Sequence, residues 1–469
     1  MRSRFLAASL VAAVWAAGPG VARGQAVLSL NRSGSGARAA GMANAFVAVS
    51  DDGTAASWNP AGLAQLRKPE LSAVYTISDR ASRLDGLRSL DGRWAYSPRD
   101  VADTTASMDF ASLAVPFSVA GRPVTVQGGW RRLYQLSGTF EGSVFRRPLG
   151  ASGGSAESFT FRQDRTRGDV DLLSLAGAVR LTRRTLLGGS VDLWRGDWSD
   201  LRAVAGDREP GDGPEVSDFV ALSTAHRVRG DNFSAGLLLA YPSWNAGLVY
   251  HSPFWASYRL QQEFRSSLGP TEALDSGPDA RFRFPRSIAL GVAWRPARRW
   301  TVALDATHDE WSDFLIDRIP GIEGPINFFD GEPPGFSSTR DTLSFNAGAE
   351  HLFQREGSVI PVRFGIAWEP QGPMDRILRD PVDYVMVAGG AGFNTNSFKF
   401  DAAVQYRWGR YQVTDTLEIP NIVAAVGTGA PDAEGHNRGR EWRVKVSVIY
   451  RITDTDKLGA ILRKVFVGS

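Results

Sequence analysis

The sequence of 469 residues has no cysteine, only five histidines, and five lysines among its 53 basic residues. The absence of cysteine excludes a disulfide framework, a thiolate metal site and a cysteine nucleophile. No apolar run reaches about 18 residues, and the mean hydropathy is −0.19, which together exclude a bundle of membrane-spanning helices. Basic and acidic residues nearly balance, at 53 and 50, so no nucleic-acid footprint is expected. A membrane β-barrel remains compatible, because its alternating strands average to neutral hydropathy.

Residues 1–24 have the pattern of a secretory signal peptide. A basic start precedes an apolar run over 5–17, and the small residues Ala22 and Gly24 precede Gln25. A single membrane anchor is the alternative, but this run is short for about 30 Å of hydrocarbon. We expect cleavage before Gln25, which removes three arginines and no acidic residue. The mature chain then carries no net charge.

Beyond residue 68 the apolar residues alternate with period two, as in 398–408 and 442–448. The pattern predicts fourteen strands, at 70–79, 105–116, 122–138, 168–182, 185–198, 218–241, 244–263, 281–294, 299–314, 339–353, 359–368, 384–392, 396–411 and 438–452. A soluble sandwich would show the same alternation. However, long connections follow the odd strands and connections of about one to five residues follow the even ones, as in transmembrane barrels. We therefore predict an all-β, fourteen-stranded antiparallel transmembrane β-barrel over 69–452, in the bacterial outer membrane.

One segment could change this count. Residues 218–241 are long, and a turn at 229–231 would divide them and reverse the loop parity downstream. We predict a single long strand with a bulge or bend instead. Its partner at 244–263 is equally long, so the two strands are expected to project beyond the membrane.

Two segments flank the predicted barrel. Residues 25–68 are rich in small residues, lack strand alternation, and contain the turn sequence Asn59-Pro60-Ala61-Gly62. They predict a compact hatch inside the barrel or a periplasmic lid. Residues 453–469 carry apolar residues at helical spacing, which indicates a short C-terminal periplasmic helix.

The stretch from Ala39 to Leu63, with Asn-Pro-Ala at 59–61, resembles the N-terminal hatch of the FadL-type outer-membrane transporters of long-chain fatty acids and aromatic hydrocarbons. Stretches 244–250, 284–311 and 361–368 are similar to that family in order and spacing. The resemblance implies capture of an apolar ligand by extracellular loops and its sideways release through the barrel wall, while the hatch closes the axial route. In the family this opening accompanies a kink in the third strand. Gly128 and Gly129 are candidates for that kink, or for tight packing against the hatch.

Polar residues on the predicted inner strand faces, together with Arg38 of the predicted hatch, supply candidates for ion pairs or for holding a ligand carboxylate. They are Arg38, Arg283, Arg363, Lys399, Arg407 and Arg443. No catalytic or metal-binding pattern has its required context: His251 and Ser252, for example, point to opposite faces of one strand. We expect no enzyme activity, no cofactor and no metal.

The expected function is passive import of a hydrophobic small molecule. Outer-membrane lipid, lipopolysaccharide and the barrel-assembly machinery are the other expected partners, and nucleic acid is not. The alternatives are a structural or secretion-accessory barrel of the same fold that carries no ligand, and a general polar porin.

Overall fold

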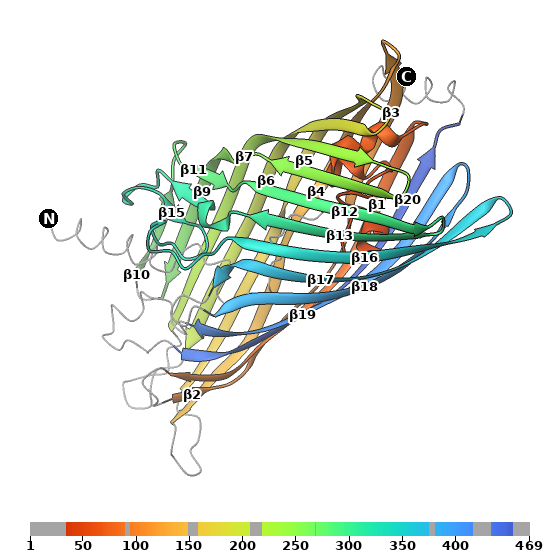
Figure 1. Ribbon diagram of the computed structural model, residues 1–469. Coiled ribbons are helices and arrows are strands. Elements are labelled where there is room, and N and C mark those ends of the chain that lie inside the picture. Colours follow the sequence, from red (N-terminus) through yellow and green to blue (C-terminus); the bar gives the residue numbers. More distant parts are fainter. Residues whose placement is uncertain are drawn as a thin grey trace, which may run out of the picture.

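The computed structural model describes residues 34–89, 94–148, 158–206, 218–267, 269–374, 380–415 and 433–453. They form a closed antiparallel barrel of fourteen strands (Figure 1). The barrel closes where β1 pairs with β20, from Glu70 opposite Arg451 onwards. The predicted signal peptide, and all but the first residue of the predicted C-terminal helix, lie outside the described residues.

The wall is built in chain order. Its first six strands are β1 (Glu70–Ser89), β3 (Arg99–Val119), β4 (Arg122–Pro148), β5 (Ser158–Arg180), β6 (Thr185–Gly206) and β7 (Asp218–Ala240). The seventh strand consists of β8 (Trp244–His251) and β9 (Phe254–Ser266), and the eighth of β11 (Arg281–Phe284) and β12 (Ser287–Ala297). The wall ends with β13 (Trp300–Asp309), β16 (Thr342–Arg355), β17 (Ser358–Met374), β18 (Pro381–Asn394), β19 (Phe398–Asp415) and β20 (Ala433–Arg451). Short strands β2 (Trp94–Tyr96), β10 (Gly269–Asp275), β14 (Leu315–Asp317) and β15 (Ile326–Asn327) lie in the long connections.

The strand count and the loop parity predicted from the sequence are confirmed. The segment 218–241 is one strand, because β7 pairs with β6 without a register shift from Asp218 to Leu239. Several strands extend further than predicted at the long-loop end. The third, predicted to end at residue 138, runs to Pro148, and the fourth begins at Ser158 instead of 168. The sequence of these extensions does not keep the sustained hydrophobic alternation that marks the other strands.

Three neighbouring strands are interrupted at one level of the wall. The seventh breaks at Ser252–Pro253 and the eighth at Pro285–Arg286, and His251 and Phe254 pair with the residues on either side of that second break. Proline cannot donate a ladder hydrogen bond, which explains both interruptions. The ninth strand, predicted to reach residue 314, ends at Asp309 and is followed by the 3₁₀ turn η3 (Trp311–Asp313).

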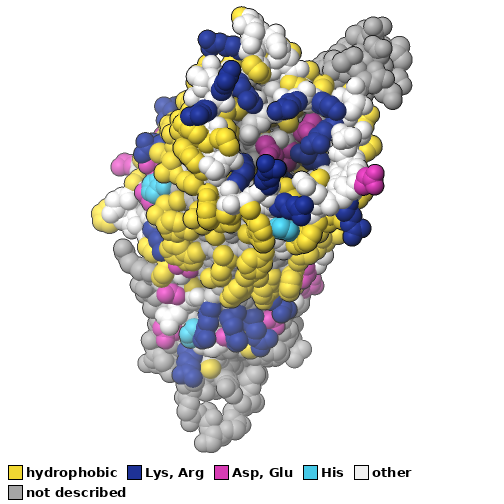
Figure 2. Space-filling view, turned by 45° about the vertical axis from the view of Figure 1, so that its right-hand side comes forward, with side chains coloured by type: hydrophobic (Ala, Val, Ile, Leu, Met, Phe, Trp, Pro, Cys, Tyr) yellow, Lys and Arg dark blue, Asp and Glu magenta, His cyan; other side chains and the backbone are white. Residues whose placement is uncertain are grey.

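The outer face of the barrel carries a belt of exposed apolar side chains. On β12, for example, Leu290, Val292 and Trp294 are each more than half exposed while the residues between them point inward. Figure 2 shows this belt around the middle of the molecule, with Lys and Arg on both sides of it. Such a belt is suited to an apolar surrounding medium. Among the described residues, no helix is long and apolar enough to cross a membrane.

Residues 34–68, which we call the N-terminal segment, lie inside the barrel (red in Figure 1). They contain one turn of helix, α2 (Ala37–Gly41), and the 3₁₀ helices η1 (Ala55–Ser57) and η2 (Pro60–Gln65). Most of the segment is buried, and its small side chains pack on wall residues such as Leu186 and Leu238 near the short turns. The segment therefore fills the short-turn half of the lumen.

An aromatic cluster occupies the long-loop half of the lumen. Its centre is Phe282 on β11, whose ring lies 4.9 Å from that of Phe314 and 5.0 Å from that of Phe328, measured between centroids. Phe314 and Phe328 belong to the connection 310–341, which thus folds inward over the lumen. The buried members of this cluster are Tyr134, Leu136, Val170, Leu172, Trp194, Trp198, Val228, Ala256, Tyr258, Leu260, Ala280, Phe282, Phe284, Trp311, Phe314, Ile316, Ile319, Ile326, Phe328 and Phe329.

Candidate functional site

The N-terminal segment rests against glycines of the inner wall. These glycines, which we call the glycine band, are Gly188, Gly236, Gly247, Gly291, Gly348 and Gly365. A Cβ atom at Gly247 would lie 2.7 Å from the carbonyl oxygen of Val47, and one at Gly348 would lie 2.6 Å from Cβ of Met42. Such distances are shorter than any normal contact, so the segment lies this close to the wall only because these positions have no side chain.

The predicted turn Asn59-Pro60-Ala61-Gly62 begins η2 and fixes the segment to β7. The Asn59 side chain accepts the N–H of Ala61 at 3.1 Å and caps the helix, with Pro60 at its first position. Its Nδ2 donates to the carbonyl oxygens of Val47 and Leu237, each at 3.1 Å. Gly62 is required because a Cβ there would collide with the carbonyl of Ser50.

Polar side chains of the wall satisfy the irregular backbone of the segment. Asp305 Oδ2 accepts the N–H groups of Phe46 and Val47 at 2.6 and 2.8 Å. Amide side chains donate to carbonyl oxygens of the segment from Gln127, Asn245, Asn346 and Gln405. Because buried backbone groups need partners, these contacts stabilise the segment inside the barrel.

A buried ion-pair network joins the segment to three strands. Arg38 contacts Asp51 of the segment and lies 3.0 Å from Oε1 of Glu350 on β16. Glu350 also accepts from Arg363 on β17 at 2.7 Å, and Arg363 donates to Asp401 on β19 at 2.7 Å. The Arg363 side chain is fully buried, so it requires both carboxylates. Arg38 and Arg363 thus act in one network, which fixes the position of α2.

A second network surrounds Glu441 on β20. Its carboxylate lies 3.0 Å from Arg80, 2.8 Å from Arg407 and 2.8 Å from Arg443. Arg407 also stacks over the ring of Tyr384, with 4.6 Å between Cζ and the ring centroid. A second carboxylate, Glu369, lies 3.5 Å from Arg407, so three guanidinium groups share two carboxylates in this region of the lumen.

The other two predicted cations differ from these. Lys399 is buried on β19 and lines a pocket of about 590 Å³ at the short-turn end. Burial raises the pKa of Asp52, but the charges of Lys399 and Arg38 and hydrogen bonds from Thr54 lower this pKa below its ordinary value. Arg283 does not face the lumen: its neighbours Phe282 and Phe284 do, while Arg283 pairs with Asp313 at 2.7 Å and lies over the exposed Trp255.

The wall has a gap between β3 and β4, which we call the lateral gap. Ladder pairs join Phe110 to Arg131 and Ala102 to Thr139, but none joins residues 103–109 to residues 132–138 within these two described strands. Each strand carries an extra residue at the end of the gap that is nearer the short turn between β3 and β4. A bulge at Asp109 interrupts the pairing of β3 with β1, and a bulge at Leu133 interrupts that of β4 with β5. Two facing bulges separate the strands here.

At the gap, β4 bends into the lumen. Arg80 on β1 donates to the carbonyl of Gln135 on β4 at 3.1 Å, although β3 lies between these two strands in the barrel. The predicted kink at Gly128 and Gly129 lies on this same strand, but both residues are regularly paired with β3 and β5. The bend follows them at Leu133, so no irregularity occurs at the glycines themselves.

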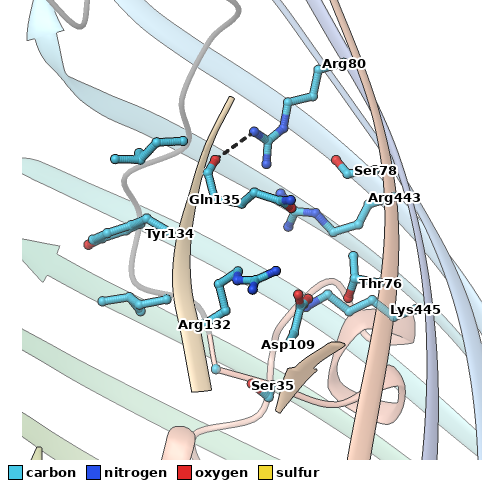
Figure 3. Close-up of a pocket in the computed structure, with 13 residues that line it drawn as sticks. Ser35, Thr76, Ser78, Arg80, Asp109, Arg132, Tyr134, Gln135, Arg443 and Lys445 are labelled. Carbon is cyan, nitrogen blue, oxygen red and sulfur yellow. Dashed lines mark hydrogen bonds and ion pairs between the residues drawn. The ribbon is translucent and has the colours of Figure 1, made fainter. Parts of the chain in front are cut away.

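The displaced part of β4 separates the aromatic cluster from a small cavity. Tyr134 and Leu136 face the aromatic cluster. On the other side lies a cavity of about 60 Å³, between β4 and the inner face of β1 and β20. Figure 3 shows Arg80, Arg132, Arg443 and Lys445 around this cavity, with Asp109 as the acidic side chain among its lining residues. The cavity is therefore polar and carries an excess of positive charge.

Several of these residues were missed by the sequence analysis. Asp305 and Gln127 are single polar residues in ordinary strands, with no motif to mark them. The glycine band has a signal, because Gly247 lies opposite Gly291 and Gly348 opposite Gly365, but only the strand register reveals it. Within the described residues no group of three His, Asp or Glu side chains is placed to hold a metal ion.

This architecture matches known solved structures. A Pseudomonas aeruginosa FadL homologue is 13% identical with a TM-score of 0.64, and the match covers 89% of this chain and 98% of that one. The chain has the FadL-type fold. The P. putida toluene transporter TodX is 14% identical (TM-score 0.54, covering 90% and 100%). The CymD monoaromatic hydrocarbon channel is also 14% identical (TM-score 0.51, covering 91% and 100%). No protein-family model and no curated protein sequence matches the chain. At this level of identity the FadL-type likeness concerns the fold.

Proposed function

We propose that this protein is a bacterial outer-membrane channel for passive import of hydrophobic small molecules, with release sideways through the lateral gap. The observation that carries the proposal is the gap between residues 103–109 and 132–138, where the wall lacks ladder pairs and β4 bends inward. An apolar solute leaving there enters the surrounding lipid directly and avoids the charged short-turn half of the lumen. The solved structures with this fold include a toluene transporter and a monoaromatic hydrocarbon channel, which supports a hydrophobic small molecule as the substrate.

The N-terminal segment acts as the hatch in this proposal. It fills the short-turn half of the lumen and is fixed there by the glycine band, by Asp305 and by the Arg38 network. Axial passage would require all of these contacts to break. The aromatic cluster lies on the opposite side, next to Tyr134 and Leu136 of the displaced strand. It offers the apolar surface on which a ligand from the long loops would first be held before it reaches the gap.

One observation favours the alternative, a structural or secretion-accessory barrel without a ligand. The cavity beside the gap is lined by Arg132, Arg443 and Lys445 rather than by apolar side chains. A neutral hydrocarbon gains nothing from such a lining. The two functions differ in one measurable respect, which is whether closing the gap stops uptake.

A reversible cross-link across the gap tests the proposal. Asp103 and Ser137 are hydrogen-bonded across it, so Asp103→Cys with Ser137→Cys places two thiols close together in a chain that otherwise has none. Accumulation of labelled long-chain fatty acid and of labelled toluene is measured in cells that lack their own importer. We expect oxidation to reduce uptake several-fold and a reductant to restore it.

The matched control is the pair Val115→Cys with Val126→Cys, which lie opposite each other where the same two strands are regularly paired. Its oxidation should leave uptake unchanged. Wild-type cells that accumulate neither compound above the level of cells without the protein would favour the accessory barrel. Uptake that persists through the oxidised gap pair would exclude lateral release at this position.

A further inference from the structure

Arginines of three adjacent strands form a row on the outer face of the barrel. Arg83 on β1 lies opposite Arg438 on β20, which in turn lies opposite Arg410 on β19. Arg440 projects from the same face of β20, two residues nearer the middle of the barrel. All four are exposed, with 51% of the Arg83 side chain and 58% of the Arg438 side chain accessible. We call these four residues the arginine row.

The arginine row borders the apolar belt on the side of the long connections. Next to it toward the middle of the barrel are Trp408 and Trp442, which are 40% and 47% exposed. The ring of Tyr406 lies 4.4 Å from that of Trp442 between centroids. Exposed aromatic side chains of this kind mark the boundary between hydrocarbon and headgroups. The row is therefore at the level of the lipid headgroups, and the long connections place it in the outer leaflet.

The row carries more positive charge than its protein neighbours balance. Asp85 contacts Arg438, and Asp100 lies 3.2 Å from Arg83. Arg410 and Arg440 make no ion pair within 4.0 Å with the described residues. Like charges placed directly opposite each other on neighbouring strands repel, which destabilises the pairing unless an anion lies between them. Three neighbouring strands span about 10 Å, so one anionic headgroup can reach several of these guanidinium groups.

We propose that the arginine row binds the phosphate groups of lipopolysaccharide in the outer leaflet. Guanidinium groups bind phosphate through paired, charge-assisted hydrogen bonds, and the neighbouring tryptophans contact the acyl chains of the same lipid. The inference rests on the outer-membrane location proposed above but not on transport. Binding at this surface and uptake through the gap are separate measurements, so one can fail without the other.

The test uses the full-length folded protein in phosphatidylcholine nanodiscs that contain lipid A as the probe. Native mass spectrometry measures the lipid A retained by the wild type and by Arg410→Gln with Arg440→Gln. The control is Arg227→Gln with Arg259→Gln, two exposed arginines that each have their own carboxylate, Asp197 and Asp275. Heat-modifiability on a gel shows that each variant is folded.

We expect the Arg410/Arg440 variant to bind lipid A at least about tenfold more weakly, because two charge-assisted contacts are lost, while the control pair binds as the wild type does. Arg410→Lys with Arg440→Lys should recover part of the binding, since lysine keeps the charge without the planar fork. Equal binding by the glutamine variant would overturn the proposal. So would equal binding of dephosphorylated lipid A, or displacement of lipid A by inorganic phosphate at the same phosphate concentration.

Discussion

The carboxylate of Asp305 accepts the backbone N–H of Val47 at 2.8 Å and so joins the inner wall of the barrel to the N-terminal segment. The same oxygen accepts the N–H of Phe46 at 2.6 Å. Both donors belong to a turn without regular secondary structure, and Asp305 is buried on β13 opposite Gly291 of β12. One carboxylate therefore accepts hydrogen bonds from two N–H groups, which are both donors and cannot bond to each other.

Replacing Asp305 should loosen the segment. Asp305→Ala leaves two buried N–H groups without an acceptor, at a cost of about 1–3 kcal/mol for each. We expect the purified protein to show ion conductance in planar bilayers well above the wild-type level, because the segment leaves the lumen more often. Asp279→Ala, at an exposed aspartate, is the control and should conduct as the wild type does. Wild-type conductance from Asp305→Ala would contradict the anchoring role.

The glycine band predicts that a single methyl group is harmful at one glycine and harmless at another. Gly188→Ala places a Cβ against the backbone of Pro60 and Ala61, whereas a Cβ at Gly128 meets nothing within 4 Å. We expect Gly188→Ala to destabilise the docked segment by about 1–3 kcal/mol, as in an overpacked core. Gly128→Ala should change stability by no more than about 0.5 kcal/mol. The midpoint of heat-induced gel mobility shift measures both, and equal midpoints would disprove close packing at Gly188.

The charge of Asp52 makes segment docking depend on pH in a defined direction. Its pKa is lowered in the folded protein, so its contribution to stability is present above the ordinary value of about 3.9 and is lost as the pH falls through the lowered pKa. Asp52→Asn keeps the acceptor for Thr54 but removes the charge that faces Lys399 and Arg38. We expect higher conductance than the wild type at pH 7. The difference should shrink below about pH 3.9, whereas a difference independent of pH would argue against a charge effect.

Glu350 is the carboxylate shared by Arg38 and Arg363. Glu350→Gln leaves the fully buried Arg363 with one carboxylate fewer, and breaking a buried pair in this way costs about 3–5 kcal/mol. Urea unfolding from lipid vesicles should show this loss. Glu263→Gln is the matched control, because Glu263 and its partner Arg265 are exposed, and it should cost less than about 1 kcal/mol. Similar losses from both variants would show that the buried network adds no particular stability.

The sequence predicted the barrel because its strands have one apolar and one polar face, and because connection length alternates. It did not predict the extension of β4 to Pro148, because the apolar residues of 139–148, namely Phe140, Val144 and Phe145, do not keep a sustained period of two. The interruptions beside Pro253 and Pro285 could have been read from the prolines. The predicted signal peptide and C-terminal periplasmic helix at the two chain ends, like the part played by the barrel-assembly machinery, stay predictions.

The inner site was only partly predictable. Asn59 and Pro60 form a local turn, so neighbouring residues determine their roles. Arg363 was identified as a charge on an inner strand face, and Arg38 as its counterpart in the predicted hatch. Arg283 was placed on the wrong face, because its strand is interrupted just after it and the alternation shifts there. The lateral gap could not be found by searching for glycine, because its bulges are at Asp109 and Leu133. Each bulge depends on how a strand pairs with both of its neighbours, and the sequence of a single strand does not show this.

The glycine band has a consequence for how such barrels diverge. Each of its glycines lies against particular backbone or side-chain atoms of the N-terminal segment, so a change in the wall at these positions requires a change in the segment. A larger residue in the wall at these positions requires a shifted loop in the segment. The N-terminal segment and the wall are therefore matched in shape, and two barrels with equal strand numbers need not accept each other's N-terminal segments.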